Sequence, residues 1–143
     1  MGRVIGLALF LVLGISVLAA ATEIELQGPL FVPTAYINEN GKIMDKNHVL
    51  LGRIDNDGIV YDTDNRHLGF VEKDLTVMDT HYRTLVTTDA DGVMTNAEGV
   101  VVGAFTDTKL ADAEGRPLLR YLVQGDKRAI LGYFYFFSPG FGK

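Results

Sequence analysis

Apolar residues recur at fixed spacings between residues 41 and 122 and divide this stretch into five similar units. Three units span residues 41–57, 58–74 and 75–91, and two slightly shorter ones span 92–107 and 108–122. The third, eleventh and fourteenth positions of the units are apolar in all but one case, and β-branched and aromatic types dominate, which is typical of strands. We predict that these positions form the core: Ile43, Leu51, Ile54, Val60, Leu68, Val71, Val77, Leu85, Thr88, Met94, Val102, Phe105, Leu110, Leu118 and Tyr121.

Polar turn residues separate the apolar positions. The fifth position always carries a side chain that can accept a hydrogen bond from a backbone N–H two residues on: Asp45, Asp62, Asp79, Asn96 or Asp112. The eighth position holds residues that, except for Tyr82, tolerate the left-handed backbone of a hairpin turn: His48, Asn65, Tyr82, Gly99 or Gly115. Asn-Gly or Asp-Gly pairs at 40–41, 57–58 and 91–92 mark a second turn between units. Each unit is therefore predicted to be a β-hairpin, with strain at Tyr82.

Glycine occupies the twelfth position in three units, as Gly52, Gly69 and Gly103. It falls between two apolar positions that are three residues apart, which strict alternation would place on opposite faces. A glycine bulge or bend there would return both side chains to one interior. We predict that the second strand of each hairpin bends at this position.

One short hairpin cannot bury its own apolar face, so the units must share a core. Closure into a ring is favoured over an open stack because it removes exposed strand edges. Residues 35–38 match the end of a unit, and residues 131–134 match its eleventh to fourteenth positions. We therefore predict a single all-β domain over residues 22–143, with a closing strand at 129–137.

The repeated order of Gly, apolar residue, Asp, turn residue and Leu-Gly-x-apolar resembles that of the bacterial five-fold β-flower proteins over residues 41–122. Leu75 departs from it where a glycine usually opens the unit, and Val86 and Leu119 replace the strand glycine. The resemblance implies hairpins arranged radially about a pseudo-fivefold axis and an exported location. It implies no activity, substrate or catalytic residues.

The N-terminus has the pattern of a targeting segment. Arg3 precedes an uncharged run from Val4 to Ala21, which ends in three alanines. We predict a helical signal peptide at residues 1–21 and a secreted or periplasmic mature protein. The alternative is that the segment is not cleaved and anchors the protein, because its length just suffices to span a bilayer. In that case the protein would contact the membrane through this segment.

Composition narrows the possible chemistry. The 143-residue chain has no cysteine, which excludes disulfides, thiolate metal sites and thiol nucleophiles. Its formal net charge of −5 argues against nucleic acid as a partner. The serines are Ser16, in the predicted signal peptide, and Ser138, which leaves no basis for a serine triad.

The acidic turns raise the question of a cation site. Residues 55–58 resemble half of a calcium loop, but Arg53 and Asp64 occupy the places of its first and twelfth ligands, so turn chemistry is the preferred explanation and a weak cation site the alternative. In a ring, the fifth-position acids would share one rim and Asp57, Asp74 and Asp91 another, where they could hold a cation or a sugar. His48, His67 and His81 occupy different unit positions, so we predict turn and solvent-facing roles, with no metal and no cofactor.

The C-terminal segment is the richest in aromatic residues, with five in a row from Tyr133 to Phe137. One interpretation is a strand buried on both sides that closes the ring. The other is a contact surface in which Tyr133, Tyr135, Phe137 and Phe141 bind a second copy, another envelope protein or a glycan.

Taken together, the sequence predicts an exported, non-catalytic binding or structural protein of the bacterial envelope, whose partner is another envelope protein or a glycan. The competing hypothesis is a glycan-acting hydrolase that uses a carboxylate pair. A deep cleft with two facing acids would favour the hydrolase, whereas an exposed aromatic patch would favour binding.

Overall fold

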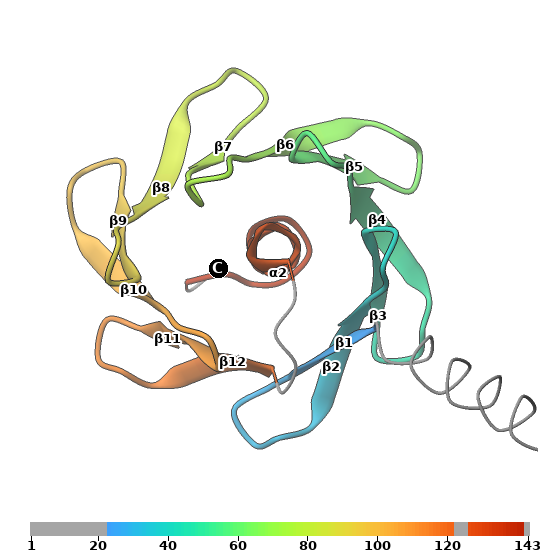
Figure 1. The fold of residues 1–143 in the computed structure, drawn as a ribbon, viewed down its shortest axis with the longest axis horizontal. Helices are drawn as coiled ribbons and strands as arrows, with labels where there is room; N and C mark the ends of the chain where they lie inside the picture. The colour runs from blue at the N-terminus through green and yellow to red at the C-terminus, as the bar shows by residue number, and fades with distance from the viewer. Residues whose placement is uncertain (1–22, 122–125, 142–143) are drawn as a thin grey trace, which may run out of the picture.

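The computed structural model describes residues 23–121 and 126–141, so the predicted signal peptide lies outside the described residues. Every strand is antiparallel to its neighbours in sequence, and the first also pairs with the last, which closes the sheet into a ring (Figure 1). The strands are β1 (Ile24–Gln27), β2 (Pro33–Ile37), β3 (Lys42–Asp45), β4 (Leu50–Ile54), β5 (Ile59–Asp62), β6 (His67–Val71), β7 (Val77–Met78), β8 (Thr84–Thr88), β9 (Val93–Asn96), β10 (Val101–Phe105), β11 (Lys109–Asp112) and β12 (Pro117–Tyr121).

Within the described residues the strands form six hairpins, which project outward around the ring (Figure 1). Five of them are the predicted units, so the all-β ring of hairpins is confirmed. The sixth is β1–β2, and the partial repeat recognised at residues 35–38 is the end of its second strand. Closure comes from the pairing of β1 with β12, in which Leu26 lies opposite Tyr121.

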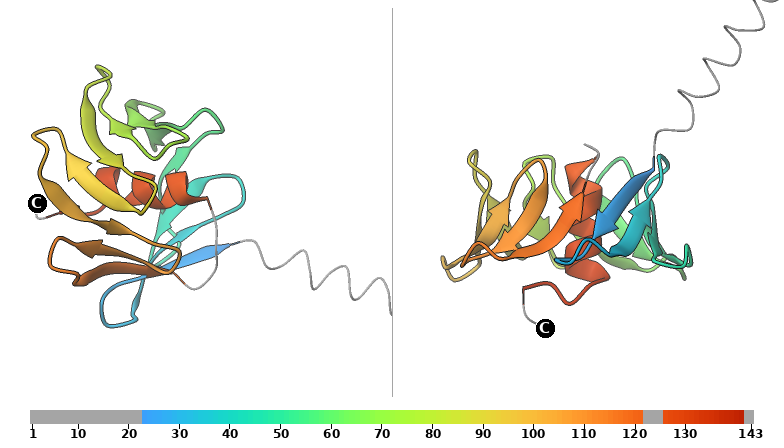
Figure 2. Two further views of the ribbon diagram at one scale, coloured as in Figure 1. Left: turned by 60° about the vertical axis from the view of Figure 1, so that its left-hand side comes forward. Right: turned by 90° about the horizontal axis from the view of Figure 1, so that it is seen from below.

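The predicted closing strand at 129–137 is wrong, because Lys127–Phe136 form helix α2, which runs through the middle of the ring (Figures 1 and 2). Since β1 and β12 already close the sheet, no strand edge remains for this segment. Its backbone groups are buried inside the ring and must therefore bond to one another, as a helix allows. Asp126 caps the helix by accepting a hydrogen bond from the Arg128 backbone N–H at 2.9 Å. A short apolar run does not distinguish a buried strand from a buried helix.

The core prediction holds for two of the three unit positions. All five third-position side chains are fully buried, and the fourteenth-position side chains are buried except Thr88, which is half-buried. At the eleventh position Leu51, Leu68, Val102 and Leu118 are half-buried at the edge of the core. Leu85 is 37% exposed. The eleventh position is therefore only marginally part of the core.

A shift in strand register explains the eleventh position. Ile43 lies opposite Gly52, whereas Met44 lies opposite Leu50, so Leu51 is an extra residue without a partner. The same shift occurs in all five units. The predicted irregularity exists, but it lies one residue before the glycine, and it turns the twelfth and fourteenth positions inward together.

The strand glycines make room for aromatic rings from the C-terminal segment. A side chain at Gly52, Gly69 or Gly103 would overlap the ring of Phe137, Phe136 or Phe141, respectively. Val86 and Leu119, at the same position of two other units, are buried in the core cluster themselves. The twelfth position is thus glycine where an aromatic ring packs against it.

The tips of three hairpins carry a ring that contacts the preceding hairpin. His48 stacks on Tyr36 with ring centroids 4.0 Å apart, and Tyr82 stacks on Phe70 at 4.8 Å. Both tip residues have a positive φ, as do the other eighth-position residues, so the predicted left-handed turns are confirmed, Tyr82 included. In the sixth hairpin Phe31, also at positive φ, lies 4.4 Å from the Arg120 guanidinium and carries the pattern across the β1–β12 junction.

Replacing Gly52 with alanine tests the close packing at the twelfth position. The added methyl group would overlap both the Tyr61 carbonyl oxygen of the neighbouring strand and the Phe137 ring, so we expect Gly52→Ala to lower the free energy of unfolding by about 1–3 kcal/mol. Gly28→Ala is the matched control, since its methyl group would meet Thr34 Oγ1 at an ordinary 3.4 Å. Urea unfolding of both variants checks this, and equal stability of the two would contradict the packing described.

Candidate functional site

The ring has two faces, which lie at opposite ends of helix α2 (Figure 2). At the start of the helix the Arg128 guanidinium donates to the Asn56 carbonyl, 3.2 Å away, in the turn between β4 and β5. We call this side the turn face. At the end of the helix Phe136 and Phe137 pack against the strand glycines, and residues 137–141 cross the side that carries the hairpin tips. We call this side the tip face.

The turn carboxylates accept hydrogen bonds from backbone N–H groups. Asp62 Oδ1 accepts hydrogen bonds from the backbone N–H groups of Asp64 at 2.8 Å and Arg66 at 3.0 Å. The fifth-position residue of every unit makes the same pair of bonds, which confirms the predicted role. The backbone N–H of Arg66 holds the pKa of Asp62 below its usual value, and the backbone N–H of Thr76 does the same for the pKa of Asp74.

The second carboxylate oxygen is paired in three of the five units. Asp62, Asp79 and Asp112 accept from the Nε of an arginine four residues later, at 2.7–2.9 Å. Across residues 23–121 and 126–141, no group of three or more His, Asp or Glu side chains is placed to hold a metal ion. The rim of fifth-position residues is therefore made of side chains that serve their own turns. On the other rim Asp74 does the same, whereas in the turns of Asp57 and Asp91 the accepting side chains are Asp55 and Asp89.

The histidines serve as aromatic and polar contacts between neighbouring strands and tips. His48 stacks on Tyr36 and its Nε2 lies 3.4 Å from Glu23 Oε1. His67 packs edge-on against Tyr61 at 4.8 Å. The structure does not bring these two side chains together with His81, whose Nδ1 lies 3.5 Å from Thr80 Oγ1.

The four aromatic residues predicted to contact a partner do not form one surface. Tyr133 is 5% exposed inside the ring, where burial raises the pKa of its hydroxyl. Phe137 lies against Gly52, whereas Phe141 lies against Gly103, in another hairpin. Tyr135 and Phe141 are neighbours, with ring centroids 5.9 Å apart.

A turn after the helix brings Phe141 back to the ring. Ser138 Oγ donates to the Phe134 carbonyl at 2.6 Å and accepts from the Gly140 backbone N–H at 3.3 Å. Gly140 has a positive φ of 65°. The Phe141 ring then packs edge-on against Phe134, with centroids 4.8 Å apart.

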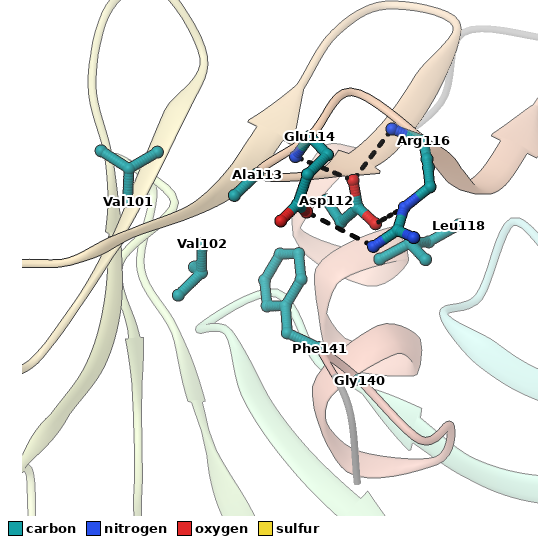
Figure 3. A pocket seen from close by; sticks show the side chains of 9 residues that line it. All are labelled: Val101, Val102, Asp112, Ala113, Glu114, Arg116, Leu118, Gly140 and Phe141. Atoms are coloured by element: carbon teal, nitrogen blue, oxygen red, sulfur yellow. Dashed lines mark hydrogen bonds and ion pairs between the residues drawn. The ribbon is translucent and has the colours of Figure 1, made fainter.

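The tip face is hollowed beside this turn. A hollow of about 500 Å³ lies between hairpins β7–β8 and β9–β10 and the C-terminal segment. A second hollow of about 370 Å³ adjoins it and shares Val102, Gly140 and Phe141, with the Phe141 ring between Val102 and the pair of Asp112 and Arg116 (Figure 3). We call the two together the tip-face groove. Its first part is lined by Leu85, Asn96, Val102, Tyr135, Phe136, Gly140 and Phe141.

Sequence reasoning found two of these groove residues, Tyr135 and Phe141, and missed the others. Leu85 and Val102 looked like core positions because the unit pattern places them with buried leucines. Asn96 looked like an ordinary turn residue, which it also is. One feature of the sequence could have pointed to Asn96 as a groove residue, namely that it is the one amide among the fifth-position residues.

The turn face carries a polar hollow of about 620 Å³, lined by Asn56, Asp57, Glu72, Lys73, Asp74, Thr76 and Arg128. Three of these are acids, which is the feature expected of a carboxylate-pair hydrolase. A general acid for glycoside cleavage needs a raised pKa, whereas the backbone N–H of Thr76 lowers the pKa of Asp74. The turn-face hollow is thus lined by acids, whereas the 500 Å³ part of the tip-face groove is lined mostly by apolar and aromatic groups.

Comparison with known protein families matches residues 32–138 to the model described as "5-fold beta-flower protein". The match runs from the tip of the first hairpin through helix α2, so the chain belongs to the 5-fold β-flower family. This family is not a known enzyme family, and it suggests a small non-enzymatic protein. No curated protein and no solved structure matches significantly. In the described part of the chain, no helix has the length and apolar character needed to cross a membrane.

The turn carboxylates predict acid sensitivity. The pKa of Asp62 is lower in the folded chain than its ordinary value of 3.8, so its charged form stabilises the fold. This stabilisation is present above pH 3.8 and is lost as the pH falls through the lower pKa of the folded state. Asp62→Asn keeps the acceptor oxygen, as Asn96 does, but removes the charge. Urea midpoints measured between pH 7 and pH 3 should fall less steeply for Asp62→Asn than for the wild type, and identical slopes would contradict this role.

Proposed function

We propose that this chain is an exported, non-catalytic binding protein of the bacterial envelope and that the tip-face groove is its binding surface. The observation that carries the proposal is a groove whose aromatic floor is packed against the ring. Phe136 is part of helix α2 and Phe141 packs on Gly103. A preformed hollow of a few hundred Å³, mostly apolar with a few polar groups, is typical of ligand sites.

Exposed apolar side chains around the groove support the same proposal. Val100 is 57% exposed, Val101 50% and Leu85 37%. Burying such side chains against a partner is favourable, at about 25 cal/mol per Å² of apolar surface. Another envelope protein or a glycan is the proposed class of partner, and the uncharged run from Val4 to Ala21 supports export.

The polar hollow on the turn face supports the competing function, a glycan-acting hydrolase. In that case Asp57 and Glu72 would be the candidate carboxylates, because both line the hollow. Release of reducing ends from cell-wall glycan by the purified protein, abolished in Asp57→Asn or Glu72→Gln, would establish this function in place of binding.

Site-specific photo-crosslinking in intact cells tests the binding proposal. A photoreactive residue at Leu85 lies in the groove, and one at Val49, which is 58% exposed on another hairpin tip, is the matched control. We expect a discrete adduct from position 85 in the periplasmic or secreted fraction and none from position 49. Adducts from neither position, equal adducts from both, or a protein confined to the cytoplasm would overturn the proposal.

A further inference from the structure

The repeat allows each hairpin to serve as a reference for the others, and hairpin β9–β10 differs from them in charge. In three units an acid at the fifth position pairs with an arginine at the ninth: Asp62 with Arg66, Asp79 with Arg83 and Asp112 with Arg116. In β9–β10 these positions hold Asn96 and Val100. Of the five units, this one lacks both of these charges. Its exposed tip residue Glu98 does not line the 500 Å³ hollow, whereas Asn96 and Val102 of the same hairpin do.

The apolar lining is also incomplete in this sector. Leu51, Leu68, Val102 and Leu118 are half-buried against the core cluster, whereas Leu85, the equivalent residue in β7–β8, is 37% exposed. Leu85 faces the same hollow as Val102, Phe136 and Phe141. The hollow of about 500 Å³ is thus walled by aliphatic groups and floored by aromatic rings.

One polar group in this part of the groove is available to a ligand. Asn96 Oδ1 accepts hydrogen bonds from the backbone N–H groups of Glu98 and Val100, both at 3.0 Å. The side-chain NH₂ of Asn96 has no hydrogen-bond partner within the described residues and can donate. In the adjoining hollow, Arg116 is already paired with Asp112 at 2.7 Å and with Glu114 at 3.4 Å. Among the described residues, no charged side chain lines the hollow of about 500 Å³, so an anionic or cationic ligand would lose water there without gaining an opposite charge.

We infer that the tip-face groove binds a neutral amphiphile, with its alkyl chain between Leu85 and the Phe136 and Phe141 rings and its uncharged polar head beside Asn96. This inference rests on the proposed function and names the chemistry of the ligand. The binding free energy of an alkyl chain in an aliphatic and aromatic lining becomes more favourable in proportion to the apolar surface that the chain buries. The residues that line the hollow beside Asn96 are uncharged, and the Asn96 side chain offers the head group a hydrogen-bond donor.

Alkyl glucosides of different chain length test the inference on the full mature chain. D-glucose, hexyl glucoside and octyl glucoside are titrated below their micellar concentrations while backbone NMR shifts are followed. Each methylene group should strengthen binding about fourfold, so octyl glucoside should bind about 15-fold more tightly than hexyl glucoside. D-glucose should not bind measurably, and the shifts should cluster on residues 85, 96, 102 and 135–141.

Two variants and a control locate the site. Leu85→Asp places a charge on the wall and should weaken octyl glucoside binding at least tenfold. Asn96→Asp restores the residue of the four other units, so the turn should remain intact, while the lost donor and the added charge should weaken binding about tenfold. Val49→Asp adds the same charge at an exposed apolar position outside the groove and should bind as the wild type does.

The outcomes separate this inference from the proposed function. Binding that does not increase with chain length, or equal losses in Leu85→Asp and Val49→Asp, would overturn the inference. If D-glucose or a longer glycan binds in the groove as tightly as octyl glucoside, the alkyl assignment falls and the groove remains a binding surface. Shifts confined to residues outside the groove would count against both.

Discussion

The structure depends on filling the interior of a closed ring. Each hairpin turns only about three side chains inward, and short strands around a circle leave an axial space that these side chains do not reach. Helix α2 occupies this space, and Ile130, Leu131 and Phe134 are at most 2% exposed. At Gly132 the helix faces the ring closely, since a methyl group added there would be in ordinary contact with Val60 Cγ2 at 3.5 Å and Ile54 Cδ1 at 3.7 Å. A two-residue strand such as β7 cannot be stable alone and depends on close packing of this kind.

Contacts between hairpins act together with this helix. The left-handed tip residues cost conformational energy, as the positive φ of Tyr82 and Phe31 shows. Their rings are placed by that geometry onto Phe70 and Arg120 of the preceding hairpin. Where the tip residue is Gly99 or Gly115, a side chain would meet nothing within 4 Å. The tips therefore join neighbouring hairpins around much of the ring, including the β1–β12 junction.

The hairpins could be predicted because their determinants are local. A carboxylate such as Asp62 and a residue such as Asn65 dictate a turn through hydrogen bonds and backbone conformation within four residues. Helix α2 could not be predicted in the same way, because an apolar segment from Ala129 to Phe137 becomes a helix only once the ring around it is closed. The bulge at Leu51 likewise depends on the opposite strand, and it moved an expected core position to the edge. The tip-face groove was missed because it lies between segments distant in sequence, and only Tyr135 and Phe141 stood out in advance.

The most direct test of the account is whether helix α2 lies inside the ring in solution. Nuclear Overhauser effects measured on the full chain should connect the Gly132 α-protons with the methyl groups of Val60 and Ile54, and residues 127–136 should show the short sequential contacts of a helix. Cross-strand contacts between residues 129–137 and β1 or β12, without contacts to Val60, would contradict the central claim.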